Sequence, residues 1–140
     1  MTTSAMAQQS RGLFLLSYLG YLTHLGLETL TLHFSRESID PETWQGYVES
    51  MTSPSTEWTL AVFAFLTLLP AGLAILAGGR RMWIATAIVG AVMTVLNALH
   101  YVGELAEHFG AVGAMSLVFH ILPMGWATWL AWRCSRADGE

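Results

Sequence analysis

Apolar residues dominate four long segments of this chain, and shorter polar segments separate them. The apolar runs extend over about residues 12–34, 56–78, 82–108 and 111–133. Each run is as long as the roughly 20 residues that an α-helix needs to cross the hydrocarbon core of a bilayer. The pattern therefore predicts an all-α fold: a single domain over residues 1–140, built as a multi-pass membrane four-helix bundle.

A shorter helical pattern lies in the connection at residues 35–55. Asp40-Pro41-Glu42 is a typical helix start, with an Asp cap, Pro at the first position and an acid in the first turn. Apolar residues then recur at helical spacing, which predicts a short amphipathic helix on the outer surface, a candidate lid above the polar residues described below. These residues are Trp44, Tyr47, Val48 and Met51. Ser53-Pro54 repeats the start signal and opens the next long helix. Residues 1–10 are small and polar, and we expect them to be frayed.

Composition and charge agree with a membrane protein of the plasma membrane or a bacterial inner membrane. The chain is 54% hydrophobic and 11% charged, with a mean hydropathy of +0.48, whereas about a quarter of the residues in a soluble domain are charged. Most of the basic residues flank one set of helix ends, so the positive-inside rule predicts an N-in/C-in topology with the 35–55 loop outside. These residues are Arg11, Arg80, Arg81, Arg133 and Arg136. No basic patch for nucleic acid is present, and the lone Cys134 excludes an internal disulfide.

Three histidines fall at similar depth in the predicted bundle. His100 lies ten residues before Gly110, a tight-turn candidate, and His120 lies ten residues after it, which places both about 15 Å from that turn. His24 precedes Phe34, the last apolar residue of its run, by the same distance. Ionisable groups at this depth are costly and normally face a bundle interior or a wet cavity, so they indicate a functional site.

Two of these histidines begin the same H-x-x-x-E element. Glu28 follows His24 by four residues, and Glu104 follows His100 by four, so each carboxylate lies one turn nearer the same membrane face as its histidine. The two elements belong to polar stripes on the first and third long helices, and a further stripe on the last helix is followed by Pro123, which can open the backbone locally. The stripes comprise Ser17, His24, Glu28 and Thr31; Asn97, His100, Glu104 and His108, with Tyr101 beside them; and Ser116 and His120.

Inward-facing imidazoles and carboxylates are the usual ligands of transition metals in helix bundles. His24, His100, His120 and Glu104 are the candidate ligands of an iron, zinc or manganese ion, with His108 as a ligand at the entrance. A pair of imidazoles could instead ligate haem b. The simpler alternative is that each histidine is a packing residue whose nitrogen is satisfied by a Glu, a Ser or a backbone carbonyl.

Four features of the chain recur together in a known pattern: His24-Leu25-Gly26-Leu27-Glu28, the outer loop with Trp44 and Tyr47, the acidic Glu57 at the start of the next helix, and Leu122-Pro123 in the last helix. In these features the chain resembles the emopamil-binding, sterol-isomerase-like (EXPERA) family. The resemblance implies a four-helix membrane domain with a lipid-accessible cavity. It further implies that His24, Glu28 and Glu57 form an acid/base set around a carbocation-like intermediate, with Tyr101 and the last helix lining the cavity. His100, Glu104 and His120 depart from the family's pattern, and they favour a metal.

Three functions remain open. The first is a metal-dependent membrane enzyme, redox or Lewis-acid, that acts on a lipophilic substrate. The second is a metal-free acid/base lipid isomerase, and the third is a haem-b-binding or accessory subunit of a larger membrane complex. The candidate catalytic residues are Glu28, Glu104 and Tyr101. Two unpaired carboxylates cannot both stay charged at this depth, so we expect Glu28 to carry a proton and Glu104 to bind the ion.

Overall fold

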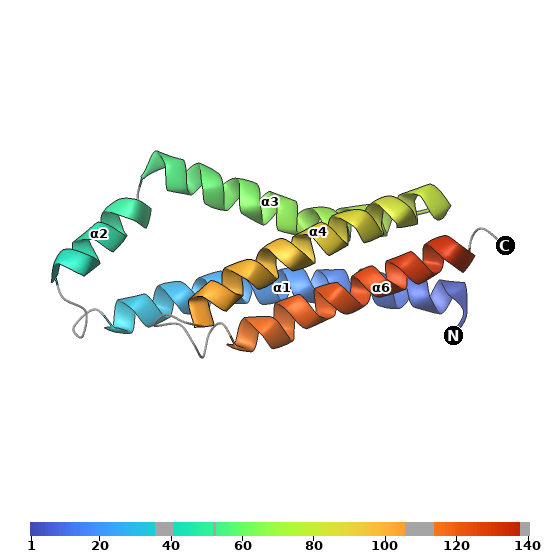
Figure 1. Ribbon diagram of the computed structural model, residues 1–140, viewed down its shortest axis with the longest axis horizontal. Coiled ribbons are helices and arrows are strands. Elements are labelled where there is room, and N and C mark those ends of the chain that lie inside the picture. The colour runs from blue at the N-terminus through green and yellow to red at the C-terminus, as the bar shows by residue number, and fades with distance from the viewer. Residues whose placement is uncertain (36–40, 52, 106–113, 138–140) are drawn as a thin grey trace.

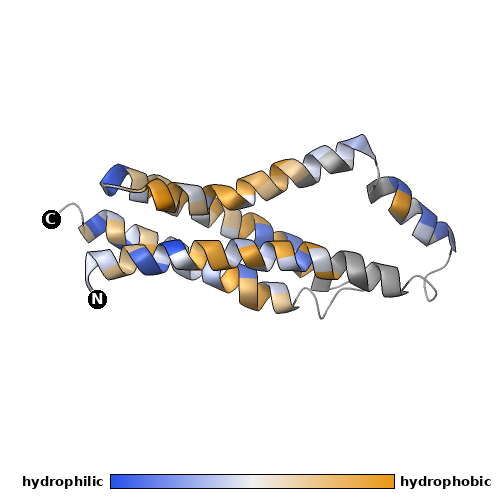
Figure 2. Cartoon of the chain, turned by 180° about the vertical axis from the view of Figure 1, so that it is seen from behind, coloured by the Kyte–Doolittle hydropathy of each residue, from blue (hydrophilic) through white to orange (hydrophobic). Residues whose placement is uncertain are grey.

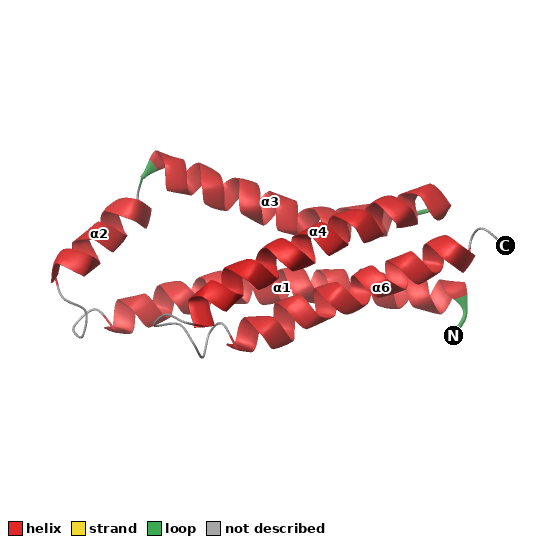
Figure 3. Ribbon diagram, viewed as in Figure 1, coloured by secondary structure: helices red, strands yellow, loops and turns green. Residues whose placement is uncertain are grey.

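The structure, a computed structural model, describes residues 1–35, 41–51, 53–105 and 114–137. Within these ranges, the side chains of residues 28–35, 43, 47, 50, 51, 56, 57, 60 and 103–105 lie outside the description. Every element of the described ranges is helical (Figure 3). The elements are α1 (Thr3–Ser35), α2 (Pro41–Met51), α3 (Pro54–Leu76), α4 (Arg80–Leu105), the π-helical turn η2 (Leu117–Ile121) and α6 (Leu122–Ala137).

The long helices run side by side, and the two chain ends lie at the same end of the molecule (Figure 1). α6 packs most extensively against α1 and α4, whereas α3 packs against α1 and α4 near the end that carries the termini. Towards the opposite end α3 diverges from the other helices, and α2 lies beyond this opening with its main contact at the start of α3. The all-helical fold is confirmed, and so are the starts of α2 at Pro41 and of α3 at Pro54.

Apolar residues predominate along α3 and are frequent on the other long helices (Figure 2). Two helices of the described chain, Arg80–Val102 and Ala114–Ala137, are long and apolar enough to cross a membrane, and Ala61–Leu76 is a shorter apolar helix. Many large hydrophobic side chains point away from the interior, among them Leu19, Phe65, Leu76, Leu99 and Leu122.

Residues 3–10 are part of α1, so the expectation that residues 1–10 are frayed is wrong for all but Met1 and Thr2. Thr2 Oγ1 accepts a hydrogen bond from the Ala5 amide, at 3.3 Å, as a helix cap does. Met6 is only 6% exposed, and Ser10 donates a hydrogen bond to the Ala127 carbonyl of α6 at 2.9 Å. These tertiary contacts stabilise a segment whose local composition does not predict a helix.

An arginine joins α1 to the end of α3. Arg11 donates hydrogen bonds from Nε to the Ala74 carbonyl and from Nη2 to the Ala77 carbonyl, both at 2.9 Å. The last carbonyls of a helix have no partner within the helix and carry partial negative charge, so a cation is a favourable cap there. The same guanidinium lies 5.6 Å from the centre of the Trp83 ring at the start of α4. Arg11 therefore connects three helices at the end of the molecule that carries the termini.

Candidate functional site

Two buried histidines join α1 to the last helix by reciprocal hydrogen bonds to serines. His24 of α1 has its Nδ1 2.7 Å from Ser116 Oγ, and His120 of η2 has its Nδ1 2.9 Å from Ser17 Oγ. Ser17 and His24 are seven residues apart and lie on one face of α1, where both are buried. The predicted polar stripes of these two helices therefore face each other in the interior, and each stripe supplies one serine and one histidine.

The contacts of Ser17 determine which ring nitrogen of His120 carries the proton. The Ser17 hydroxyl donates its proton to the His120 carbonyl at 2.9 Å, and the Ser17 carbonyl lies 2.7 Å from His120 Nδ1. A carbonyl can only accept a hydrogen bond, so Nδ1 carries the proton in the neutral ring. His120 Nε2 then holds a lone pair that can accept a proton or bind a metal. A ring nitrogen fixed by a backbone carbonyl is also the usual support of a metal-bound histidine.

The π-helical turn places His120 for these contacts. Proline has no backbone N–H, and its ring conflicts with the carbonyl four residues earlier, so Pro123 disturbs regular α-helix at Phe119. The chain responds with the five-residue π-turn Leu117–Ile121, in which the Leu122 amide donates to the Leu117 carbonyl. Gly20 of α1 lies directly against this turn, because a Cβ at Gly20 would collide with the Phe119 carbonyl oxygen. Turns of this kind are frequent at functional sites.

Tyr101 of α4 lies among the three predicted histidines. Its ring centre is 4.6 Å from that of His24, 5.2 Å from that of His100 and 5.7 Å from that of His120. Tyr101 is fully buried, and it packs edge-on against His24 and His120. The sequence therefore located Tyr101 correctly beside the histidine stripe, and the structure places it at the centre of the aromatic cluster.

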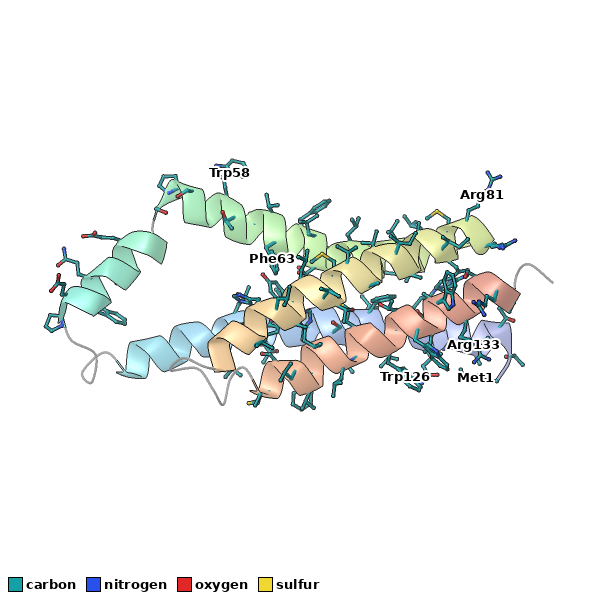
Figure 4. The ribbon with its side chains drawn as sticks, in the orientation of Figure 1. Met1, Trp58, Phe63, Arg81, Trp126 and Arg133 are labelled. Atoms are coloured by element: carbon teal, nitrogen blue, oxygen red, sulfur yellow. The ribbon has the colours of Figure 1, made fainter. Side chains whose placement is uncertain are left out.

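Two further aromatic residues complete the cluster. Tyr21 of α1 lies 5.5 Å from the His120 ring and 6.2 Å from Phe63 of α3, and Phe63 lies 6.3 Å from His100. Phe63 is on the inner side of α3 (Figure 4). Sequence reasoning did not select Tyr21, Phe63 or Gly20. For Tyr21 and Gly20 the available signal was a position one turn from a stripe residue, since Tyr21 follows Ser17 by four residues and Gly20 precedes His24 by four. The sequence carries no such signal for Phe63.

The three histidines gather around Tyr101, but their rings are not arranged around one ion. Two imidazoles on a tetrahedral ion have ring centres about 5 Å apart for metal–nitrogen bonds of about 2.0 Å, whereas those of His24 and His100 are 6.3 Å apart and nearly perpendicular. His100 is exposed, unlike the other two. Among the described residues no three His, Cys, Asp or Glu side chains come close enough to hold a metal ion. The side chains of Glu28, Glu57 and Glu104, and the whole of His108, lie outside the description.

A surface groove leads to the His24–Ser116 pair. It lies between α1 and the 114–121 segment and has a volume of about 280 Å³. Most of its lining is apolar, and the polar groups in it are Thr23, His24 and Ser116. The Thr23 hydroxyl is already bonded to the Leu19 carbonyl at 2.9 Å. The apolar side chains that line the groove are Leu16, Leu19, Leu27, Met115 and Phe119.

Comparison of the chain with protein-family models, with curated proteins and with solved structures found no match. The resemblance to the emopamil-binding family therefore stays a prediction from the residues that carry it. The geometry of the described residues is the basis for the function proposed next.

Proposed function

We propose that this chain is a multi-pass membrane enzyme that transfers protons to and from a lipophilic substrate, with the buried His24–Ser116 pair as the reacting centre. The observation that carries the proposal is the position of this pair: an imidazole only 2% exposed borders an apolar groove on the outside of the bundle. In a bilayer that groove opens to the lipid, so a lipophilic molecule could reach the imidazole without passing through water.

The distribution of charged and aromatic residues supports four membrane-spanning helices with both termini in the cytoplasm. Met1, Arg81 and Arg133 lie at the same end of the molecule (Figure 4). At that end Arg133 stacks over Trp129, at 5.2 Å, and Arg136 stacks over Trp132, at 5.0 Å. Tryptophan and arginine are typical of the interface between lipid and the cytoplasm. The helices α1, α3, α4 and the 114–137 segment are the four spans of this proposal.

The proposed chemistry needs no oxidant. In a double-bond isomerisation a base removes a proton from one carbon, the double bond moves, and an acid returns a proton at the other end. His24 exchanges a proton with the substrate through the Ser116 hydroxyl, which lines the groove and lies 2.7 Å from His24 Nδ1. Glu28, one turn towards the outer surface, is the proton carrier that we expect from the sequence.

Deuterium incorporation tests this chemistry without knowledge of the substrate. The purified protein is placed in lipid nanodiscs in D2O with a total lipid extract of the expression host, and mass spectrometry measures carbon-bound deuterium in the lipids. We expect incorporation with the wild type and with the control variant His33→Gln, because His33 lies off the polar stripe of its helix. We expect a loss of at least about 100-fold with His24→Gln, since general acid–base groups contribute roughly 10² to 10⁴ in rate. Equal incorporation by His24→Gln and the wild type would contradict the proposal.

Labelling from outside the cell tests the topology. Single cysteines at Ser38→Cys and Ala137→Cys, in a Cys134→Ser background, should react with a membrane-impermeant maleimide only at position 38. A label at position 137 alone would show the reverse orientation.

A metal centre is the second candidate function, and the grouping of three imidazoles around Tyr101 favours it. His24, His100, His120 and Glu104 would hold the ion, with His108 at the entrance, and the ion would supply Lewis-acid or redox chemistry. Metal analysis and an absorption spectrum of the purified protein separate the candidates. Stoichiometric metal that is lost in His24→Ala but not in His33→Ala supports the metal enzyme, and a Soret band indicates a haem-b-binding subunit. Activity in metal-free protein supports the acid/base enzyme.

A further inference from the structure

Three buried polar atoms belong to residues on three different segments that contribute to the aromatic cluster or lie one helical turn from it. They are His120 Nε2, Asn97 Oδ1 of α4 and Thr67 Oγ1 of α3, and none of them has a hydrogen-bond partner among the described residues. Their residues are fully buried: His120 and Asn97 are 0% exposed and Thr67 is 1% exposed. A buried polar atom that makes no hydrogen bond costs about 1 to 3 kcal/mol, so three of them in one protein need a physical explanation.

The three residues lie at one level of the bundle. Asn97 is one turn below Tyr101 on the same face of α4, and the Tyr101 ring is 5.7 Å from that of His120. Thr67 follows Phe63 by four residues, so it lies one turn away on the same face of α3. The Tyr21 ring connects Phe63 to His120, because its centre is 6.2 Å from the Phe63 ring and 5.5 Å from the His120 ring. Since Phe63 lies beside His100 and the two helices are antiparallel, Thr67 falls at the level of residue 96, next to Asn97.

Neighbouring hydrogen bonds define what each atom can do. Asn97 donates from Nδ2 to the Met93 carbonyl at 2.7 Å, so its amide orientation is fixed and Oδ1 is an acceptor. His120 Nε2 is an acceptor, because Nδ1 carries the proton. Thr67 Oγ1 can still donate. Four other described threonines donate to the carbonyl four residues earlier, namely Thr23, Thr59, Thr86 and Thr94, whereas Thr128 Oγ1 also has no partner among the described residues.

We infer that His120, Asn97 and Thr67 together bind one water molecule inside the bundle, and that this water donates a hydrogen bond to His120 Nε2. Two acceptors and one donor match a water molecule, which donates to His120 Nε2 and Asn97 Oδ1 and accepts from Thr67. Three hydrogen bonds are typical of a buried water. The water satisfies His120 Nε2 inside the bundle, whereas His24 borders the groove. This inference goes beyond the proposed function, because it requires neither a substrate nor a metal.

Replacement of Thr67 by the isosteric valine tests the inference, because the direction in which the unfolding midpoint changes depends on whether the Thr67 hydroxyl makes a hydrogen bond. If Thr67 donates to the water, Thr67→Val removes a hydrogen bond and lowers the unfolding midpoint of the purified protein in detergent. If the hydroxyl makes no bond, its replacement by a methyl group removes a buried unsatisfied donor and raises the midpoint. Thr86→Val is the matched control, because Thr86 is equally buried but bonds to the carbonyl of Met82 in its own helix. We expect little change there.

Nitrogen-15 NMR of the labelled histidines gives a second readout that does not depend on activity. The Nε2 resonance of His120, assigned with His120→Gln, should shift in Thr67→Val and in Asn97→Leu and should stay unchanged in Thr86→Val. A raised midpoint together with an unchanged Nε2 resonance would overturn the inference. A cation at the three atoms would give a different result. In that case the wild-type protein contains stoichiometric metal, chelation lowers its unfolding midpoint, and Asn97→Leu loses the metal; this result would overturn the inference.

Discussion

The two halves of the bundle differ in what their buried stripes contain. On α1 the stripe begins with Met6, Ser10 and Phe14 and continues with Ser17, Tyr21 and His24. The half near the termini buries many small apolar residues around Phe14 and Trp83, and its buried Ser10 and Thr86 bond to backbone carbonyls. The other half brings aromatic rings, imidazoles and hydroxyls together across the helices. The small residues are Ala71, Ala74, Ala77, Ala87, Ala127 and Ala131, and the rings and polar residues of the second half are Asn97, Tyr101, Ser116 and His120.

The two halves therefore serve different purposes: one packs the helices closely, and the other holds the polar groups of the candidate site. Alanine and glycine let helix backbones approach closely, so van der Waals packing contributes to the stability of the half near the termini, and its polar side chains need only backbone carbonyls as partners. The half with the rings must match each buried nitrogen and oxygen to a partner, and it does so through serines, a backbone carbonyl and, by our inference, a water. Gly20 is the one described glycine of this second half whose missing Cβ allows a direct backbone contact.

We expect the largest effect from the substitution that breaks this backbone contact. In Gly20→Ala the new Cβ meets the Phe119 carbonyl, which cannot rotate away, so α1 and η2 must separate and the Ser17–His120 bonds are lost. We expect a destabilisation of about 2 to 3 kcal/mol, at the upper end of the cost of overpacking. Denaturant titration in detergent micelles measures it.

Two other glycines calibrate this prediction. Gly90→Ala in the small-residue half meets side chains, Thr128 and the Phe14 ring, that can move, so we expect a cost of about 1 kcal/mol. Gly12→Ala meets nothing within 4 Å and should be neutral or stabilising. Equal losses at Gly20 and Gly90 would refute the contrast between backbone and side-chain contacts.

Removal of the cap on α3 has the next largest effect. Arg11→Met deletes two hydrogen bonds to the last carbonyls of α3 while it keeps most of the apolar stem, and we expect a loss of about 1 to 3 kcal/mol. The exposed Arg81 provides the control variant Arg81→Met, for which we expect less than about 0.5 kcal/mol. A loss of the same size in both variants would mean that charge rather than capping matters.

The smallest expected effect on stability distinguishes the two serine–histidine pairs. Ser17→Ala and Ser116→Ala should each cost about 1 kcal/mol. In Ser17→Ala the Ser17 backbone carbonyl still holds His120 Nδ1, so the histidine keeps its tautomer. In Ser116→Ala the hydroxyl that holds His24 Nδ1 is gone, so its tautomer distribution changes. Nitrogen-15 spectra of both variants measure this, and a His120 tautomer that changes in Ser17→Ala would contradict the role of the carbonyl.

The sequence by itself determined the helices and their buried faces. Hydrophobic runs gave the long helices, the Asp-Pro and Ser-Pro pairs gave the starts of α2 and α3, and the spacing of Ser17 and His24 gave the inner face of α1. These features are local, because helix starts depend on neighbouring backbone groups and a helical face depends only on the 3.6-residue period.

Only the tertiary structure decided which groups meet across the helices. The π-turn before Pro123 contains one residue more than a regular turn, and each residue of a helix adds about 100° of rotation, so the period of the last helix does not place His120. The contact between Gly20 and Phe119 sets how close α1 comes to this turn. Position and distance together pair His120 with Ser17 and His24 with Ser116, because a hydrogen bond tolerates only a few tenths of an ångström and neither helix alone specifies its neighbour.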